Sequence, residues 1–190
     1  MAARQQADPR LVKRFQRDHT VAILPLPKTI TKMAVLSATG RHPLCRVPFD
    51  HRRNGVRETV YQMAKHLRRE MGYDFVPYST EHQSTRDCAY VFSVRADVDS
   101  YFAIGGCSFH WIDWENAEPG FCLSWAWLHP HFRRQGYLRK AWPYFREHHG
   151  NFYVEYPHSA AMGAFLEKIG HVQPTAHDAP QARNLQDGPR

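Results

Sequence analysis

The residues of this chain that are best suited to chemistry form a short basic segment between an apolar run and a helix. The apolar run covers 121–128, and the segment His-Pro-His-Phe-Arg-Arg-Gln-Gly follows at 129–136. A helix that begins after such a loop presents free backbone N–H groups and the positive end of its dipole. Gly136 allows a ligand to approach the backbone closely, and Arg133 and Arg134 add positive charge. The segment therefore predicts a binding site for a pyrophosphate.

Three strands are expected to hold this segment in place. Runs rich in β-forming residues predict them at 88–96, 101–113 and 121–128. Short polar turns separate the runs, so we expect an antiparallel meander. Gly105 and Gly106 lie inside the second run and predict a β-bulge or a close approach of another backbone.

Helical periodicity and short apolar runs predict the remaining elements. We expect helices at 55–71, 136–148 and 159–170, a strand at 151–157 between the last two, and short extended pieces at 33–37 and 43–49. Ser159 can cap the third helix. Pro143 is expected to end or kink the second helix unless it lies in the first turns.

Composition divides the chain into three parts: a basic arm at 1–30, a domain at 31–172 and a flexible polar tail at 173–190. The arm could cover a cleft, form a homodimer interface, or do neither. No run approaches the roughly 18 apolar residues needed to span a bilayer. The N-terminus also lacks the apolar run of a signal peptide, so we expect no membrane contact and a cytoplasmic location.

The formal net charge of +7 favours anionic partners: a nucleotide cofactor, nucleic acid or an acidic protein surface. The four cysteines form no CxxC pair and are expected to be buried free thiols. We expect no metal site, although a zinc site that uses Cys107 and His110 with distant partners stays open.

The stretch Trp-Leu-His-Pro-His-Phe-Arg-Arg-Gln-Gly at 127–136 resembles the acetyl-coenzyme A signature of the GCN5-related N-acetyltransferases. That signature is a strand ending in an apolar residue and often His-Pro, an aromatic residue, and then R/Q-x-x-G-x-G/A. Arg133, Gly136 and Leu138 fall on its defining positions. The run Phe-Leu-Glu-Lys-Ile-Gly-His at 165–171 resembles the second helix of the family. The resemblance covers about residues 88–171.

The resemblance implies a fold, a cosubstrate and a reaction. The fold is α/β (α+β), with a mixed, mainly antiparallel twisted sheet flanked by helices. The chain would use acetyl-CoA to acetylate an amine of a protein or small molecule by direct attack in a ternary complex. The residues implied in acetyl-CoA binding are Ala126 and Leu128 for pantetheine, Arg133, Arg134, Gln135, Gly136, Tyr137 and Leu138 for the pyrophosphate, and Ser159 at the start of the second helix.

The chain departs from the family pattern at positions that bear on catalysis. Leu138 replaces the last small residue of the loop, Leu166 replaces a common tyrosine that protonates the thiolate, and Cys122 stands where histone-type members carry a glutamate base. Cys122 could in principle carry an acetyl group itself. These departures favour the alternative of a non-catalytic protein that binds acyl-CoA or nucleic acid.

Other residues are therefore candidates for proton transfer. Glu155 is the base that we favour, because its strand is expected to border the cleft. Tyr137 is a candidate acid, as is Tyr156. The remaining candidate bases are His110, Asp113, Glu118 and His158.

Overall fold

The computed structural model describes residues 24–25, 35–36, 44–48, 54–80, 86–97, 100–114 and 118–174. The expected N-terminal arm, apart from Leu24–Pro25, and the tail after residue 174 lie outside the described residues.

One mixed sheet forms the framework of the molecule. Its strands are β1 (Leu24–Pro25), β2 (Val35–Leu36), β3 (Leu44–Pro48), β4 (Cys88–Asp97), β5 (Ser100–Ile112), β6 (Gly120–Leu128) and β7 (Tyr153–Val154). The order is β2-β3-β4-β5-β6-β7, and β1 pairs with one end of β5. All pairs are antiparallel except β6 with β7, which is parallel. The predicted meander and the predicted mixed, mainly antiparallel sheet are confirmed.

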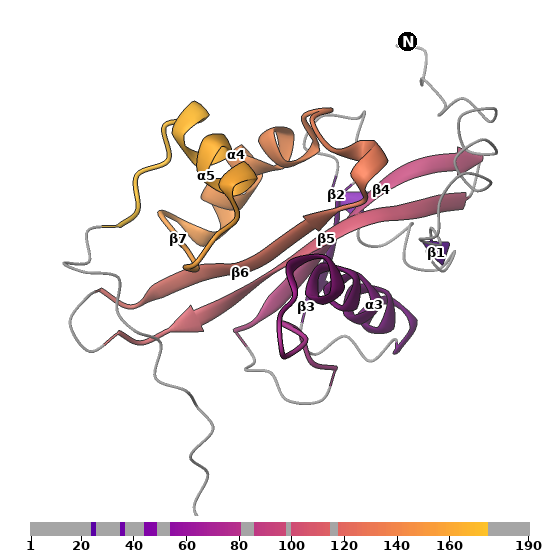
Figure 1. Ribbon diagram of the computed structural model, residues 1–190, viewed down its shortest axis with the longest axis horizontal. Coiled ribbons are helices and arrows are strands. Elements are labelled where there is room, and N and C mark those ends of the chain that lie inside the picture. Colours follow the sequence, from indigo (N-terminus) through magenta and orange to yellow (C-terminus); the bar gives the residue numbers. More distant parts are fainter. Residues whose placement is uncertain are drawn as a thin grey trace, which may run out of the picture.

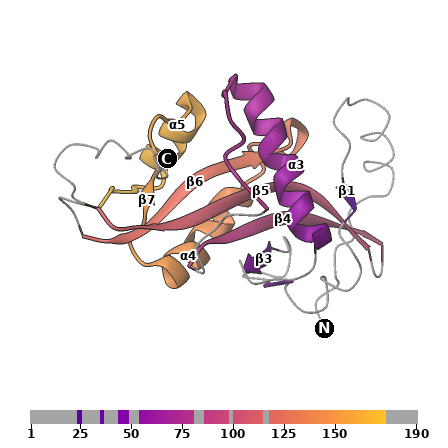
Figure 2. The same cartoon turned by 90° about the horizontal axis from the view of Figure 1, so that it is seen from below.

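Helices cover both faces of this sheet. The helices are α3 (Asn54–Met71), α4 (Tyr137–His149) and α5 (Ala160–Lys168), with a short 3₁₀ turn at Pro130–Phe132. Helix α3 lies across one face, and α4 and α5 lie on the other (Figures 1 and 2). Within the described ranges, no helix is both long and apolar enough to cross a membrane.

Strand alternation builds a separate core under each face. In β4, Tyr90 and Phe92 pack toward α4, while Ala89 and Val91 pack toward α3. The α4 core is aromatic, and Phe145 at its centre is fully buried. The sheet is therefore packed on both faces, and β6 lies next to its edge strand β7.

The glycine pair of β5 lies where other atoms approach the backbone, as its sequence predicts. A Cβ atom at Gly105 would lie 2.5 Å from the carbonyl oxygen of Trp127, and one at Gly106 would lie 3.1 Å from Met63 Sδ. The partner strand β4 also has a register shift beside this pair, between Phe92 and Ser93. The absence of side chains lets the end of β6 lie close to β5.

Pro143 does not end α4, which runs from Tyr137 to His149. A proline at this position removes the hydrogen bond to the Arg139 carbonyl. Both residues are exposed, so water can donate to that carbonyl. Trp142 and Phe145 are buried on the opposite side of the helix, and their packing stabilises it on both sides of the proline.

Strand β7 is shorter than the predicted 151–157 and pairs with β6 at two positions only. The Gln173 side chain binds its outer edge: Oε1 accepts from Val154 N at 2.9 Å and Nε2 donates to Val154 O at 3.0 Å. An amide side chain thus satisfies the backbone groups that a further strand would otherwise pair with.

Candidate active site

Strands β6 and β7 separate after a short parallel contact. They pair at Cys122–Tyr153 and Leu123–Val154, and Glu155 N then donates to Leu123 O at 3.0 Å. A cavity of about 60 Å³ opens beside this point. Its lining comes from α3 and the loop after it, from β6, and from the segment between β7 and α5: Leu67, Met71, Tyr73, Leu123, Ser124, Trp125, Ala126, Val154, Glu155, Pro157, His158, Ser159 and Met162.

A β-bulge in β6 lies at this separation. Leu123 pairs with Phe109 and Trp125 pairs with Ser108, which leaves Ser124 as the extra residue. A bulge increases local twist and changes the direction of a side chain. Here Ser124 lines the cavity, and its hydroxyl shares a hydrogen bond with Nδ1 of His110.

Three titratable side chains meet beside the bulge. One ring nitrogen of His110, Sγ of Cys122 and a carboxylate oxygen of Glu155 all lie within 4.8 Å of one another. Burial lowers the pKa of His110, while burial and the nearby Glu155 charge raise the pKa of Cys122. Partial loss of solvent raises the pKa of Glu155. A carboxylate with a raised pKa is a stronger proton acceptor near neutral pH.

The second edge of β6 is open beyond Leu123, where β7 no longer pairs with it. The carbonyl of Leu128 accepts a hydrogen bond from Nε of Arg133 at 2.8 Å, so it points to this edge. Because the N–H and C=O of one residue point to the same side of a strand, and alternate residues repeat this direction, the Ala126 backbone also faces the open edge. An extended ligand could pair with β6 here.

The basic loop after β6 has a compact, hydrogen-bonded shape. His129 caps the 3₁₀ turn by accepting from His131 N, and Gln135 Nε2 donates to His131 O at 2.6 Å. Arg134 has φ 61°, and Gly136, the N-cap of α4, has φ 82°. A glycine cap has no side chain that could accept from the first-turn N–H groups, which leaves that role to a ligand or water.

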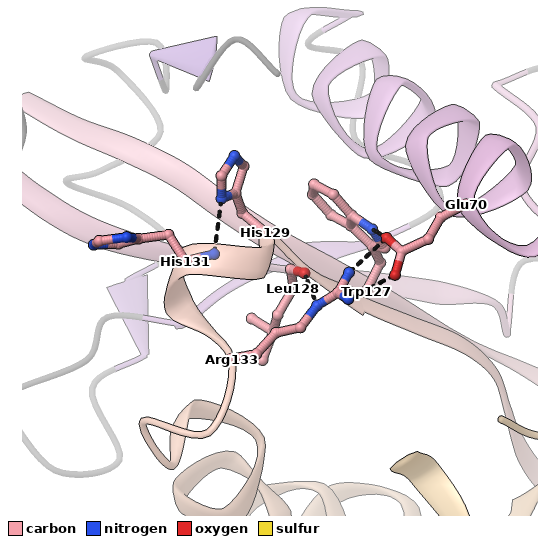
Figure 3. Close-up of polar contacts among 6 residues, drawn as sticks. All are labelled: Glu70, Trp127, Leu128, His129, His131 and Arg133. Atoms are coloured by element: carbon pink, nitrogen blue, oxygen red, sulfur yellow. Dashed lines mark hydrogen bonds and ion pairs between the residues drawn. The ribbon is translucent and has the colours of Figure 1, made fainter. Parts of the chain in front are cut away.

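The side chain of Arg133 contacts α3 and the end of β6. Besides Leu128, its guanidinium binds the carboxylate of Glu70, which also accepts from Trp127 Nε1 (Figure 3). Arg133 therefore fixes the loop against α3, whereas the side chain of Arg134 is exposed.

The remaining predicted residues divide between cavity and core. Ser159 lines the cavity and caps α5, with its hydroxyl accepting from Met162 N at 3.2 Å. Tyr137 is only 6% exposed and packs in the α4 core, with burial raising its pKa. Leu138 packs partly buried against the same core. Tyr137 is not among the residues that line the cavity, and its role as an acid stays a prediction.

Sequence reasoning missed several cavity residues. Met71 is the last residue of α3, Tyr73 follows this helix, and Met162 lies in the first turn of α5. No local motif marks them, because only the packing of α3 and α5 on the sheet brings them together. The alternative zinc site that paired Cys107 with His110 is wrong, because Cys107 lies in the α4 core. The thiol and the carboxylate that lie close to His110 belong to Cys122 and Glu155.

Strand β6 thus separates from its parallel neighbour β7 and leads into a basic loop and the N-terminus of α4. No protein-family model matches the chain, and no curated protein matches it in sequence.

Solved structures do match in fold. An aminoglycoside acetyltransferase from an uncultured soil metagenomic sample aligns with TM-score 0.50 and 12% identity over 74% of this chain and 93% of that chain. A protein described as a possible acetyltransferase from Clostridium difficile 630 aligns with TM-score 0.51 and 10% identity over 74% of this chain and 96% of that chain. A GCN5-related N-acetyltransferase from Ralstonia eutropha JMP134 aligns with TM-score 0.45 and 13% identity over 74% of this chain and 97% of that chain. The chain has the fold of the acetyltransferases that align with it at TM-scores of 0.50 and 0.51, as its motifs predict.

Proposed function

We propose that this protein is an N-acetyltransferase that moves the acetyl group of acetyl-CoA to an amine of a protein or small molecule. The observation that carries the proposal is the separation of β6 from β7, which opens a cavity with Glu155 on its wall. The acetyltransferase fold of the solved structures supports it.

The binding of acetyl-CoA would use three features of the chain in series. The thioester would enter the cavity between β6 and β7, and pantetheine would pair with the open edge at Ala126 and Leu128. The pyrophosphate would lie on the backbone amides of 134–138, with Arg134 adding charge. The Arg133 side chain would support the loop instead of binding phosphate, because Glu70 and Leu128 already occupy it.

The reaction would be a direct transfer. The amine nitrogen attacks the thioester carbonyl carbon, the new C–N bond forms, and the C–S bond breaks to release the thiolate of coenzyme A. Glu155 would take the amine proton, directly or through a water molecule. Backbone N–H groups at the bulge in β6 would polarise the carbonyl, and positioning of the two substrates would supply much of the rate.

A second function, binding of acyl-CoA without turnover, is favoured by one observation. Tyr137 is buried in the core, and Leu166, at the position of the usual tyrosine, is also buried. A thiolate is a stable leaving group, however, so a dedicated acid is not required for transfer.

Calorimetric titration with acetyl-CoA, with adenosine as the control ligand, tests the cofactor site. We expect binding of the whole cofactor that weakens by about 10-fold or more in Arg134→Ala and in Gly136→Trp. Arg146→Ala is the matched control, because Arg146 is an exposed arginine at the far end of α4. Unchanged affinity in Gly136→Trp would show that the loop is not the cofactor site.

Turnover separates the two functions. Release of free coenzyme A thiol, measured with a panel of amines, would establish the transferase and identify its acceptor class. Tight acetyl-CoA binding without thiol release for any amine would favour the binding protein.

A further inference from the structure

The cluster of His110, Cys122 and Glu155 combines ligand types that the proposed transfer reaction does not require. Only a base is needed for the transfer, and Glu155 can serve alone. The thiol of Cys122 is 1% exposed, and its cross-strand partner in the β5–β6 pair is His110. Directly paired residues of antiparallel strands project their side chains to the same face. Glu155 reaches the pair from the end of β7.

The distances within this cluster are close to those of a metal site. The three candidate ligand atoms lie within 4.8 Å of one another. Around a tetrahedral zinc ion with bonds of roughly 2.0–2.3 Å, neighbouring ligand atoms are about 3.5 Å apart. Small side-chain rotations that bring the atoms about 1 Å closer would therefore complete the coordination.

A second feature of the cluster is the fixed orientation of the imidazole. Nδ1 of His110 shares a hydrogen bond with the Ser124 hydroxyl, so Nε2 would be the ring nitrogen that binds a metal. Histidines that bind metals usually engage the other ring nitrogen in such a bond, which sets the tautomer and the ring orientation. The bulge in β6 that re-aims Ser124 thus also prepares His110 as a ligand.

We propose that His110, Cys122 and Glu155 form a Zn²⁺ site with one open coordination position. A thiolate together with an imidazole and a carboxylate suits zinc, whereas Mg²⁺ and Ca²⁺ prefer oxygen ligands throughout. Three protein ligands leave the fourth position to water or another small donor. Of the three residues Glu155 also lines the cavity, so the proposed site lies beside it. Binding displaces the thiol proton of Cys122 to solvent, so the ion coordinates the thiolate.

The test is titration of the untagged full chain with Co²⁺ and with Zn²⁺ in the absence of acetyl-CoA. Cobalt reports thiolate ligation by a charge-transfer absorption band that zinc should abolish by displacement. We expect one ion per chain, loss of the band in Cys122→Ala, and at least about 10-fold weaker Zn²⁺ binding in Cys122→Ala, His110→Ala and Glu155→Gln.

Cys45→Ala is the matched control, since Cys45 is an equally buried thiol on β3. It should retain the band and the affinity. Glu155→Gln is the variant of the three that is most expected to fold normally, because this change removes a charge and no side-chain volume. The proposal is overturned if Co²⁺ gives no thiolate band, or if the three variants bind Zn²⁺ as tightly as the parent. Neither readout depends on acetyl transfer, so this inference and the proposed function can fail separately.

Discussion

Arg133 and Glu70 form a two-point ion pair that joins the basic loop to the C-terminal end of α3. Nη1 donates to Oε1 and Nη2 donates to Oε2, each at 2.6 Å. The Arg133 hydrogen bonds lower the pKa of Glu70 despite its partial burial, and the Trp127 indole adds a third donor at 2.9 Å. The helix that carries cavity residues and the loop proposed for pyrophosphate are thereby linked by side chains 63 positions apart.

Removal of this link is expected to cost a modest amount of stability. Both side chains are more than a third exposed, at 38% and 39%, so solvent weakens the pair. We expect Glu70→Ala to lower the free energy of unfolding by about 1 kcal/mol, part of it from the unpaired Trp127 N–H. Urea denaturation measures the change, with Glu58→Ala on the same helix as control.

A double-mutant cycle with Arg133→Ala then isolates the pair. We expect a coupling of about 0.5–1 kcal/mol that shrinks in high salt. Additive effects of the two substitutions would mean that the ion pair contributes nothing measurable and that Trp127 carries the loss.

Gly105 should tolerate no side chain. A Cβ atom there would lie 2.5 Å from Trp127 O and 2.6 Å from Leu128 Cδ2, and the backbone oxygen cannot move away easily. We expect Gly105→Ala to lower the free energy of unfolding by about 1–3 kcal/mol, measured by urea denaturation. Gly163→Ala is the opposite control: its Cβ would meet His158 at an ordinary 3.5 Å, and alanine favours the helix by about 0.5–1 kcal/mol. Equal effects at both sites would contradict the close approach.

Stability is expected to fall in mild acid because of His149. This side chain is 7% exposed, shares a 2.8 Å hydrogen bond with the Tyr90 hydroxyl and stacks on Phe109. Burial, with help from Arg46 and His148, lowers the pKa of His149 from 6.5 to about 4. Between these two values the unfolded chain binds a proton that the folded chain does not. The free energy of unfolding therefore falls as the pH drops from 6.5 to about 4, and it is independent of this group above 6.5.

Across this pH range, protonation of His149 is expected to lower the free energy of unfolding by on the order of 3 kcal/mol. Burial also lowers the pKa of His66, His110 and His171, so a variant must isolate the His149 share. We expect His149→Gln to flatten the decline of stability between pH 6.5 and 4, as measured by denaturation at several pH values. His148→Gln, at the exposed neighbouring histidine, should keep most of the slope of the parent, because burial is the main cause of the low pKa of His149. An unchanged slope in His149→Gln would assign the acid sensitivity to other groups.

Most elements of the fold were predictable because they depend on local pattern. The alternation of Tyr90 and Phe92 with Ala89 and Val91 defines a strand covered on both faces, and the structure covers both. The helix at 136–148 was predicted from its periodicity, but its unbroken course through Pro143 was not, because packing of its buried side against the sheet outweighs one lost hydrogen bond. Long-range packing therefore determines where α4 ends.

The candidate site was predictable only in part. Glu155 was expected at the cleft from the resemblance, and the hairpin between β5 and β6 could have paired His110 with Cys122, since both lie equally far from the middle of the turn. The bulge at Ser124 has no sequence signal of its own, and the Arg133–Glu70 contact requires the packing of α3 on the sheet. Side chains that meet through tertiary structure therefore account for what sequence reasoning missed.

Zinc should inhibit acetyl transfer if the metal site and the proposed reaction share Glu155. A carboxylate bound to zinc cannot accept the proton of the amine, and Glu155 belongs to both sites. We expect Zn²⁺ to stop thiol release at about one equivalent per chain and EDTA to restore it. Cys122→Ala should require at least about 10-fold more Zn²⁺ for half-inhibition, since it lacks the thiolate ligand, whereas Cys45→Ala should match the parent. Inhibition at the same zinc concentration in parent and Cys122→Ala would place the inhibitory ion elsewhere and separate the metal cluster from catalysis.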